Sequence, residues 1–114
     1  FTTTSATYVD ITGFSLTTTN KTGIKAHITA SIRFNTAAAA MQPSFRFVNN
    51  AVNEGDSYWS SVAINDPWVI SISTTNSTAN SVVKVQCFAD GVNNLNVYGS
   101  TQGSTSHLTS VEIY

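Results

Sequence analysis

The chain has 114 residues, a formal net charge of −1 and only 10% charged residues, against about 25% in an average globular protein. With five Lys and Arg in total, it lacks the basic patches that bind nucleic acid and anionic membranes. Its longest strictly apolar run, residues 37–41, is far shorter than the roughly 20 residues of a membrane helix. We therefore expect no nucleic-acid partner and no membrane insertion.

The remaining composition favours one folded domain rich in neutral polar groups. The sequence contains 17 Thr, 15 Ser and 11 Asn residues, and its 41% hydrophobic and 11% aromatic content is sufficient for a core. The length suits a single domain over residues 1–114, in which residues 1–7 form an extended arm. Because the sequence starts at Phe1 without an initiator Met, we expect a fragment or a processed form.

Alternation of apolar and polar residues is the main signal along the chain. It holds without interruption over residues 24–35, which predicts one long strand with a buried face and a solvated face. The Ala-rich segment 36–41 is too short for a stable helix and is closed by Pro43, which leaves at most a turn. Shorter strands are predicted at 8–11, 14–17, 44–48, 58–64, 68–73, 82–89, 95–98 and 108–113, with turns at 12–13, 18–23, 49–50, 55–56, 65–67, 74–80, 90–91 and 99–106.

Short strands separated by turn signals every 8 to 15 residues or so are typical of antiparallel sandwiches and barrels. We predict an all-β, antiparallel two-sheet β-sandwich, jelly-roll-like, with about 8–10 short strands. The single Cys87 falls on the apolar side of the strand at 82–89, which predicts a buried thiol. Asn20 and Asn76 fit the glycosylation pattern, although such triplets arise by chance in a chain so rich in Ser and Thr.

The ionisable residues give no catalytic constellation. Glu54 and Asp56 lie two positions apart in a predicted turn, and with Asp66 they offer oxygen ligands for Ca²⁺, although turn chemistry explains them equally well. His27 and His107 are far apart and have no further ligand at zinc spacing, so a metal would need a symmetric trimer that brings copies of one His to its axis. We expect no enzymatic activity, no cofactor and no metal.

Aromatic residues near the turn at 64–67 give the candidate ligand site. Adjacent Tyr58 and Trp59 point to opposite faces of a strand, so one of them faces outward or into an interface. An exposed aromatic beside amides can stack on a sugar, whereas the alternative is an aromatic that covers a sandwich end or a subunit contact. The candidate ligand-binding residues are Trp59, Asn65, Asp66 and Trp68, with Asn50 and Asn53 in the adjacent turn region.

Three segments carry a resemblance to a known family. Residues 7–17 (TYVDITGFSLT), 45–56 (FRFVNNAVNEGD) and 106–114 (SHLTSVEIY) resemble, in the same order, the carboxy-terminal head domains of bacteriophage tail-fibre and spike proteins. The chain departs from that pattern at residues 49–51, where an Asn-Gly turn is usual, and at Ser110, where an apolar residue is usual. Such heads are similar in shape to tumour-necrosis-factor-like trimeric jelly rolls.

The resemblance implies a non-enzymatic viral structural module, a homotrimer on the virion exterior that binds a host glycan or protein receptor. One alternative is a capsid decoration protein or an extracellular filament subunit with a purely assembly role. In the filament, residues 1–7 would add as a strand to the sheet of a neighbour. A secreted carbohydrate-binding domain is a third reading, and all three readings place the protein outside the cell.

Overall fold

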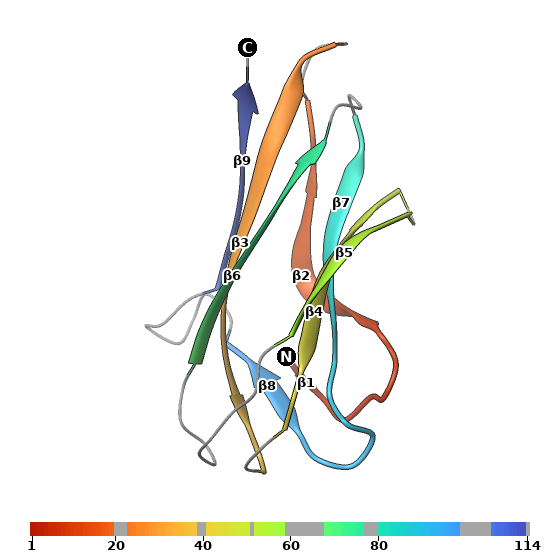
Figure 1. The fold of residues 1–114 in the computed structure, drawn as a ribbon, viewed down its shortest axis with the longest axis vertical. Helices are drawn as coiled ribbons and strands as arrows, with labels where there is room; N and C mark the ends of the chain where they lie inside the picture. Colours follow the sequence, from red (N-terminus) through yellow and green to blue (C-terminus); the bar gives the residue numbers. More distant parts are fainter. Residues whose placement is uncertain are drawn as a thin grey trace.

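The computed structural model describes residues 1–19, 23–38, 41–50, 52–58, 68–76, 80–98 and 106–113. Within these ranges the chain is all-β, which confirms the predicted fold class (Figure 1). No helix in the described part of the chain has the length and apolarity needed to span a membrane. The strands are β1 (Thr2–Thr3), β2 (Val9–Thr17), β3 (Lys25–Thr36), β4 (Ser44–Asn49), β5 (Val52–Tyr58), β6 (Trp68–Asn76), β7 (Val82–Phe88), β8 (Leu95–Val97) and β9 (His107–Ile113).

The strands form two antiparallel sheets in the order of a jelly roll. One sheet has the order β1-β8-β3-β6, with β9 also paired to β3, and the other has the order β2-β7-β4-β5. The pairs β1–β8, β2–β7, β3–β6 and β4–β5 are those of a long hairpin rolled into two layers, which is how a jelly roll closes. The predicted two-sheet, jelly-roll-like sandwich is therefore confirmed.

The long strand predicted at residues 24–35 is β3, and it organises its sheet. One edge pairs with β6 along nine consecutive positions, and the other pairs with β9 and then with β8. Arg33 marks the change of partner, because its amide donates to Ser106 Oγ (2.8 Å) and its carbonyl accepts from the Tyr98 amide (2.9 Å). This single twelve-residue strand thus pairs directly with three of the other four strands of its sheet, β6, β8 and β9.

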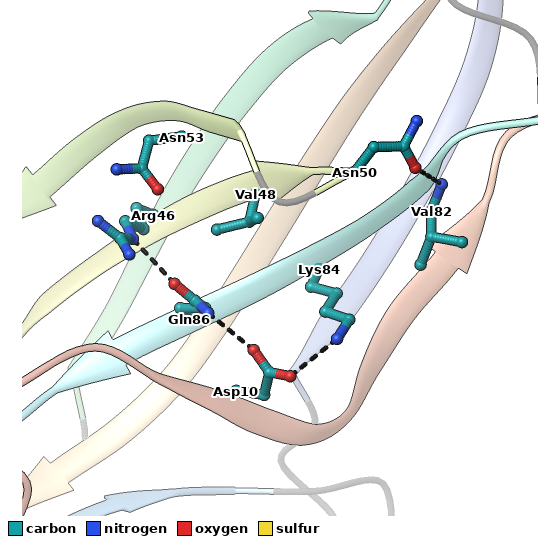
Figure 2. A pocket seen from close by; sticks show the side chains of 8 residues that line it. All are labelled: Asp10, Arg46, Val48, Asn50, Asn53, Val82, Lys84 and Gln86. Carbon is teal, nitrogen blue, oxygen red and sulfur yellow. Dashed lines mark hydrogen bonds and ion pairs between the residues drawn. The ribbon is translucent and has the colours of Figure 1, made fainter.

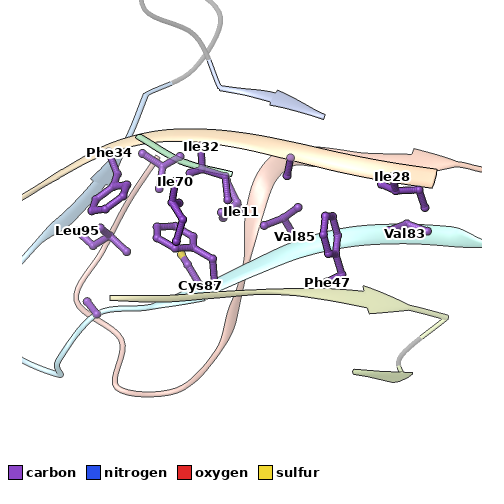
Figure 3. Close-up of a cluster of buried hydrophobic side chains, with 14 of the residues drawn as sticks. Ile11, Ile28, Ile32, Phe34, Phe47, Ile70, Val83, Val85, Cys87 and Leu95 are labelled. Carbon is purple, nitrogen blue, oxygen red and sulfur yellow. The ribbon is translucent and has the colours of Figure 1, made fainter. Parts of the chain in front are cut away.

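The core lies between β3 on one side and β7 and β4 on the other (Figure 3). Alternate residues of β3 have at most 2% exposure from Ala26 to Phe34, as the alternation predicts. The Phe34 and Phe45 rings meet across the layers with centroids 5.1 Å apart. Burying one large aliphatic or aromatic side chain contributes about 1.5–3 kcal/mol, so this interior drives folding. The buried cluster comprises Ile11, Ile28, Ala30, Ile32, Phe34, Met41, Phe45, Phe47, Ile70, Val83, Val85, Cys87, Ala89, Leu95 and Val97.

Strand β2 corrects one prediction. The segments 8–11 and 14–17 were expected to be two strands separated by a turn, but they belong to one bulged strand. In register, Asp10 faces Gln86 and Ser15 faces Lys84, so five steps along β2 match two steps along β7. Gly13, at φ +81°, adopts a conformation that few other residues accept, and the extra residues arch there without ending the strand.

Strand β5 corrects another prediction. Residues 53–56 were expected to form a turn, whereas they lie inside β5 and pair with β4. The chain reverses earlier, at Asn50, whose φ is 47°. A strand at the edge of a sheet tolerates Gly and charged residues because its outer side meets solvent, so the polar sequence that suggests a turn also suits this edge. Of the strand predicted at 58–64, all but Tyr58 lies outside the described residues.

The other predicted strands agree with the observed ones to within three residues at either end. Strand β1 was not predicted as a strand, since it falls within the segment expected to be an arm. There the Phe1 amine donates to the Val97 carbonyl (3.1 Å), and the Ala89 amide donates to the Ser5 carbonyl (2.7 Å). Residues 1–7 are thus hydrogen-bonded to their own domain.

Candidate ligand-binding site

A groove of about 530 Å³ crosses the outer face of the β2-β7-β4-β5 sheet (Figure 2). Alternation creates it: Phe45 and Phe47 of β4, and Val83, Val85 and Cys87 of β7, point into the core, so the residues between them point outward. The lining residues are Asp10, Arg46, Val48, Asn50, Asn53, Val82, Lys84 and Gln86.

A row of polar side chains runs across the strands on this face. In register, Gln86 of β7 lies between Asp10 of β2 and Arg46 of β4, and the β5 residue opposite Arg46 is Asp56. Arg46 Nε donates to Gln86 Oε1 (2.9 Å), and Gln86 Nε2 donates to Asp10 Oδ1 (2.8 Å). Lys84 Nζ donates to the other carboxylate oxygen of Asp10 (2.9 Å). Three hydrogen bonds therefore hold four side chains in fixed positions.

The Asp10 carboxylate is the acceptor on which two of these bonds converge. The hydrogen bond from Gln86, then that from Lys84, holds the pKa of Asp10 below its ordinary value. The side chains of Lys84 and Asp10 are 45% and 49% exposed, so solvent screens the ion pair and its contribution to stability stays below about 1 kcal/mol. The pair matters more for geometry than for stability.

Aromatic residues support the other end of the row. The guanidinium carbon of Arg46 lies 3.7 Å from the centre of the Tyr8 ring, a cation–π contact. The Tyr8 ring packs edge-on against Phe88, with centroids 4.9 Å apart and planes at 85°, and its hydroxyl is hydrogen-bonded to that of Ser44. Arg46 is thus fixed both by stacking and by its bond to Gln86.

The upper part of the groove combines amides with apolar surface. The backbone N–H of Asn50 donates to the Val82 carbonyl (3.0 Å), and the side-chain Oδ1 of Asn50 accepts from the backbone N–H of Val82 (3.0 Å). These two hydrogen bonds hold the turn against β7. Among the described residues, the structure gives no partner for Asn50 Nδ2 or for the exposed amide of Asn53. Val48, 6% exposed, and Val82, 40% exposed, form the apolar part of the lining.

The structure brings together two of the six predicted ligand residues, Asn50 and Asn53, although Asn53 lies in β5 and not in a turn. Trp68 begins β6 in the other sheet, opposite Phe34 in register. The remaining three predicted residues, Trp59, Asn65 and Asp66, lie outside the described residues. Sequence reasoning did not assign Asp10, Arg46, Lys84 and Gln86 to the site. The sequence signal that all four share is their outward position on alternating strands, and Asp10 and Arg46 also lie in segments that resemble tail-fibre heads.

The fold also shows where residues of the other predicted sites lie. Glu54 and Asp56 lie in strand β5, so the turn that was the alternative explanation of these residues does not exist there. Asp66 lies outside the described residues, and a Ca²⁺ site stays a prediction. Among the residues that the structure describes, no three His, Cys, Asp or Glu are grouped to hold a metal ion. Asn76 ends β6, and Asn20 is outside the described ranges.

Cys87 confirms the predicted buried thiol. Its side chain has 0% exposure within the core between the sheets. Burial raises its pKa to about 12, because the thiolate would lose its hydration there. The residue therefore stays protonated and acts as a small apolar group in the core.

No family model matches the chain, and neither does any curated protein or any solved structure. The features that bear on function are therefore the jelly-roll order, the groove and the sequence resemblance.

Proposed function

We propose that this chain is the head domain of a viral tail fibre or spike, a non-enzymatic homotrimer that binds a host surface glycan. The observation that carries the proposal is the groove on a jelly roll, in which hydrogen bonds hold polar side chains at the surface. Five of the eight lining residues come from two of the three segments that resemble such heads, one from residues 7–17 and four from residues 45–56. The third segment, residues 106–114, contains β9.

The opposite face of the sandwich supports self-association. On β6 its exposed residues are Val69, Ser71, Ser73 and Thr75, which carry no charge. The outward residues of β3 on the same face include Lys25, His27 and Arg33 but no acidic group, and Arg33 lies opposite Val69 in register. Neutral hydroxyls and an exposed apolar side chain cost less to bury against another subunit than charged groups do. This face is therefore the one we assign to the contact between copies.

Sedimentation equilibrium at micromolar concentration tests the trimer. We expect three times the 12.2 kDa chain mass, and a mass of one chain would overturn this part of the proposal. Val69→Glu, at a position with 53% exposure on the proposed contact face, should lower the mass. Val92→Glu, at a 78% exposed position in the loop between β7 and β8, is the matched control and should leave the mass unchanged.

Adhesion to immobilised cell envelopes, together with a glycan array, tests receptor binding. Trimeric display multiplies weak contacts, so we expect the trimer to bind measurably even where one site has millimolar affinity. A trimer that adheres to nothing favours a capsid decoration or filament role. A filament in which residues 1–7 pair with a neighbour would first have to break the bonds that hold Phe1 and Ser5 to their own domain. A monomer that binds glycans favours a secreted carbohydrate-binding domain.

A further inference from the structure

We infer that the groove takes a neutral saccharide that lies with its CH face on Val48 and Val82 and is hydrogen-bonded by the amides beside them. This inference rests on the proposed glycan-binding function and names the chemistry of its ligand. It also moves the sugar site from the predicted aromatic residues to the outer face of the β2-β7-β4-β5 sheet.

Including Asp56, which lies opposite Arg46 in register, the row across the sheet has two cations and two acidic residues and therefore no formal net charge. Lys84 and Asp10 neutralise each other at 2.9 Å. Arg46 is stacked on Tyr8 and bonded to Gln86, and its neighbour in register on β5 is an aspartate. Recognition of a carboxylate or sulfate uses a cation that can form short, charge-assisted bonds with the ligand. The groove therefore favours a ligand without net charge.

The hydrogen-bonding groups that remain match sugar hydroxyls. An amide side chain donates through its nitrogen and accepts through its oxygen, and a hydroxyl does both, so the Asn53 amide can serve two adjacent hydroxyls. Asn50 is held by two bonds to Val82, so its Nδ2 is positioned before a ligand arrives. Side chains that are already ordered lose little entropy when they bind, which favours affinity from few contacts.

The apolar surface gives the second half of the match. Val82 is 40% exposed and Val48, opposite Lys84 in register, is 6% exposed, so Val82 supplies most of the apolar surface from which a flat CH surface can displace water. The volume of about 530 Å³ falls within the range of small-molecule sites, roughly 300–1,000 Å³. Because the groove is open along the sheet, we expect a short oligosaccharide to lie across it.

A glycan array with neutral, carboxylated and sulfated members tests the ligand class, with the full chain as the probe. We expect the signal on neutral oligosaccharides to change less than about twofold between roughly 0.05 and 0.5 M NaCl, since salt screens only charged contacts. Binding restricted to acidic glycans, and lost at the higher salt concentration, would overturn the inference of a neutral ligand.

Three variants test the position of the site. Asn53→Ala removes the exposed amide, and Asn50→Gly removes the other amide while keeping the positive φ that the turn requires; each should weaken binding about five- to tenfold. Val82→Arg places a long side chain over the apolar surface and should abolish binding. Thermal unfolding checks that each variant folds. Asn94→Ala removes an exposed amide from the β7–β8 loop and should bind as the parent does.

The possible failures are distinguishable. If the parent binds no glycan and no cell envelope, the proposed receptor function fails. If the parent binds glycans and all three groove variants bind equally well, the receptor function stands and the groove assignment is wrong. If the variants lose binding but only acidic glycans are bound, the position is correct and the neutral chemistry is wrong.

Discussion

The two outer faces of the sandwich share one core but differ in how their side chains interact. On the β2-β7-β4-β5 face, hydrogen bonds and an ion pair join residues of three strands into a row that runs from Lys84 and Asp10 to Arg46. On the described part of the β3-β6 face, Ser and Thr lie among the basic residues Lys25, His27 and Arg33, and no ion pair is present. Alternation decides which residues point outward on both faces, but only complementary neighbours on adjacent strands turn such residues into a site.

The joined row is also a product of the jelly-roll pairing. Asp10 and Gln86 are 76 positions apart, and Arg46 is 40 positions from Gln86. Their contact requires that β7 insert between β2 and β4, which is the step that rolls the hairpin into two layers. The groove can therefore form only once β2, β7, β4 and β5 have paired.

The largest expected effect lies in the core that supports both faces. Ile28→Ala should lower the free energy of unfolding by about 2–5 kcal/mol, through lost burial and the cavity left behind. His27→Ala and Thr29→Ala, at the flanking outward positions of β3, should cost far less unless that face meets another subunit. Thermal or denaturant unfolding measures all three variants. Equal losses for Ile28 and Thr29 would contradict the alternation assigned to β3.

A smaller effect is expected from the row on the groove face. Arg46→Ala removes the contact with Tyr8 and the bond to Gln86, and should lower the free energy of unfolding by about 1–2 kcal/mol. Arg46→Lys should recover only part of this loss. An ammonium lacks the planar guanidinium that stacks on Tyr8 while its Nε donates to Gln86. Denaturant titration measures both variants, and full recovery by Lys would show that charge alone matters here.

The stability that Asp10 contributes on the groove face depends on pH. Because the folded-state pKa of Asp10 is lowered, its contribution is present above the unfolded pKa near 3.8 and is lost as pH falls through the folded value. Gln86→Ala should raise the pKa of Asp10 toward its ordinary value. The free energy of unfolding should then fall less when the pH is lowered. NMR titration of the Asp10 carboxyl measures the shift. An unchanged pKa in the variant would mean that Lys84 alone sets it.

The smallest effect on stability should come from the β3-β6 face. Ser71→Ala, at an exposed position of β6, should change the free energy of unfolding of the single chain by less than about 0.5 kcal/mol. The same unfolding measurement at increasing protein concentration reports whether this face is covered in the oligomer. A loss above about 1 kcal/mol at low concentration would show that Ser71 takes part in bonds within the sheet face.

Local patterns predicted the fold well where burial alone decides it. The uninterrupted alternation gave β3, and the apolar side of 82–89 gave β7 and the buried Cys87. The patterns failed where polar residues are tolerated in strands, at the bulge around Gly13 and at the edge strand β5. There, sheet position outweighs the turn preference of Gly, Asn and Asp.

The groove could be predicted only in fragments. Asn50 and Asn53 were identified as amides near a turn, and the hairpin β4–β5 does place both in the groove lining, Asn50 beside Val82 and Asn53 opposite Val48 in register. Asp10 and Gln86 could not be joined to them, because alternation shows which side of a strand a residue occupies but not which strands are neighbours. That information is carried by the strand order, which no local pattern contains.

The buried thiol makes this chain a natural reporter of its own opening. Cys87 is the only cysteine of the 114 residues, and both its enclosure and its pKa of about 12 suppress attack on a disulfide reagent in the folded state. Labelling must therefore wait for the two sheets to separate, so its rate in native buffer measures how often the sandwich opens. The same reaction, followed as protein concentration or added glycan increases, would reveal how much assembly or ligand slows that opening, without any engineered label.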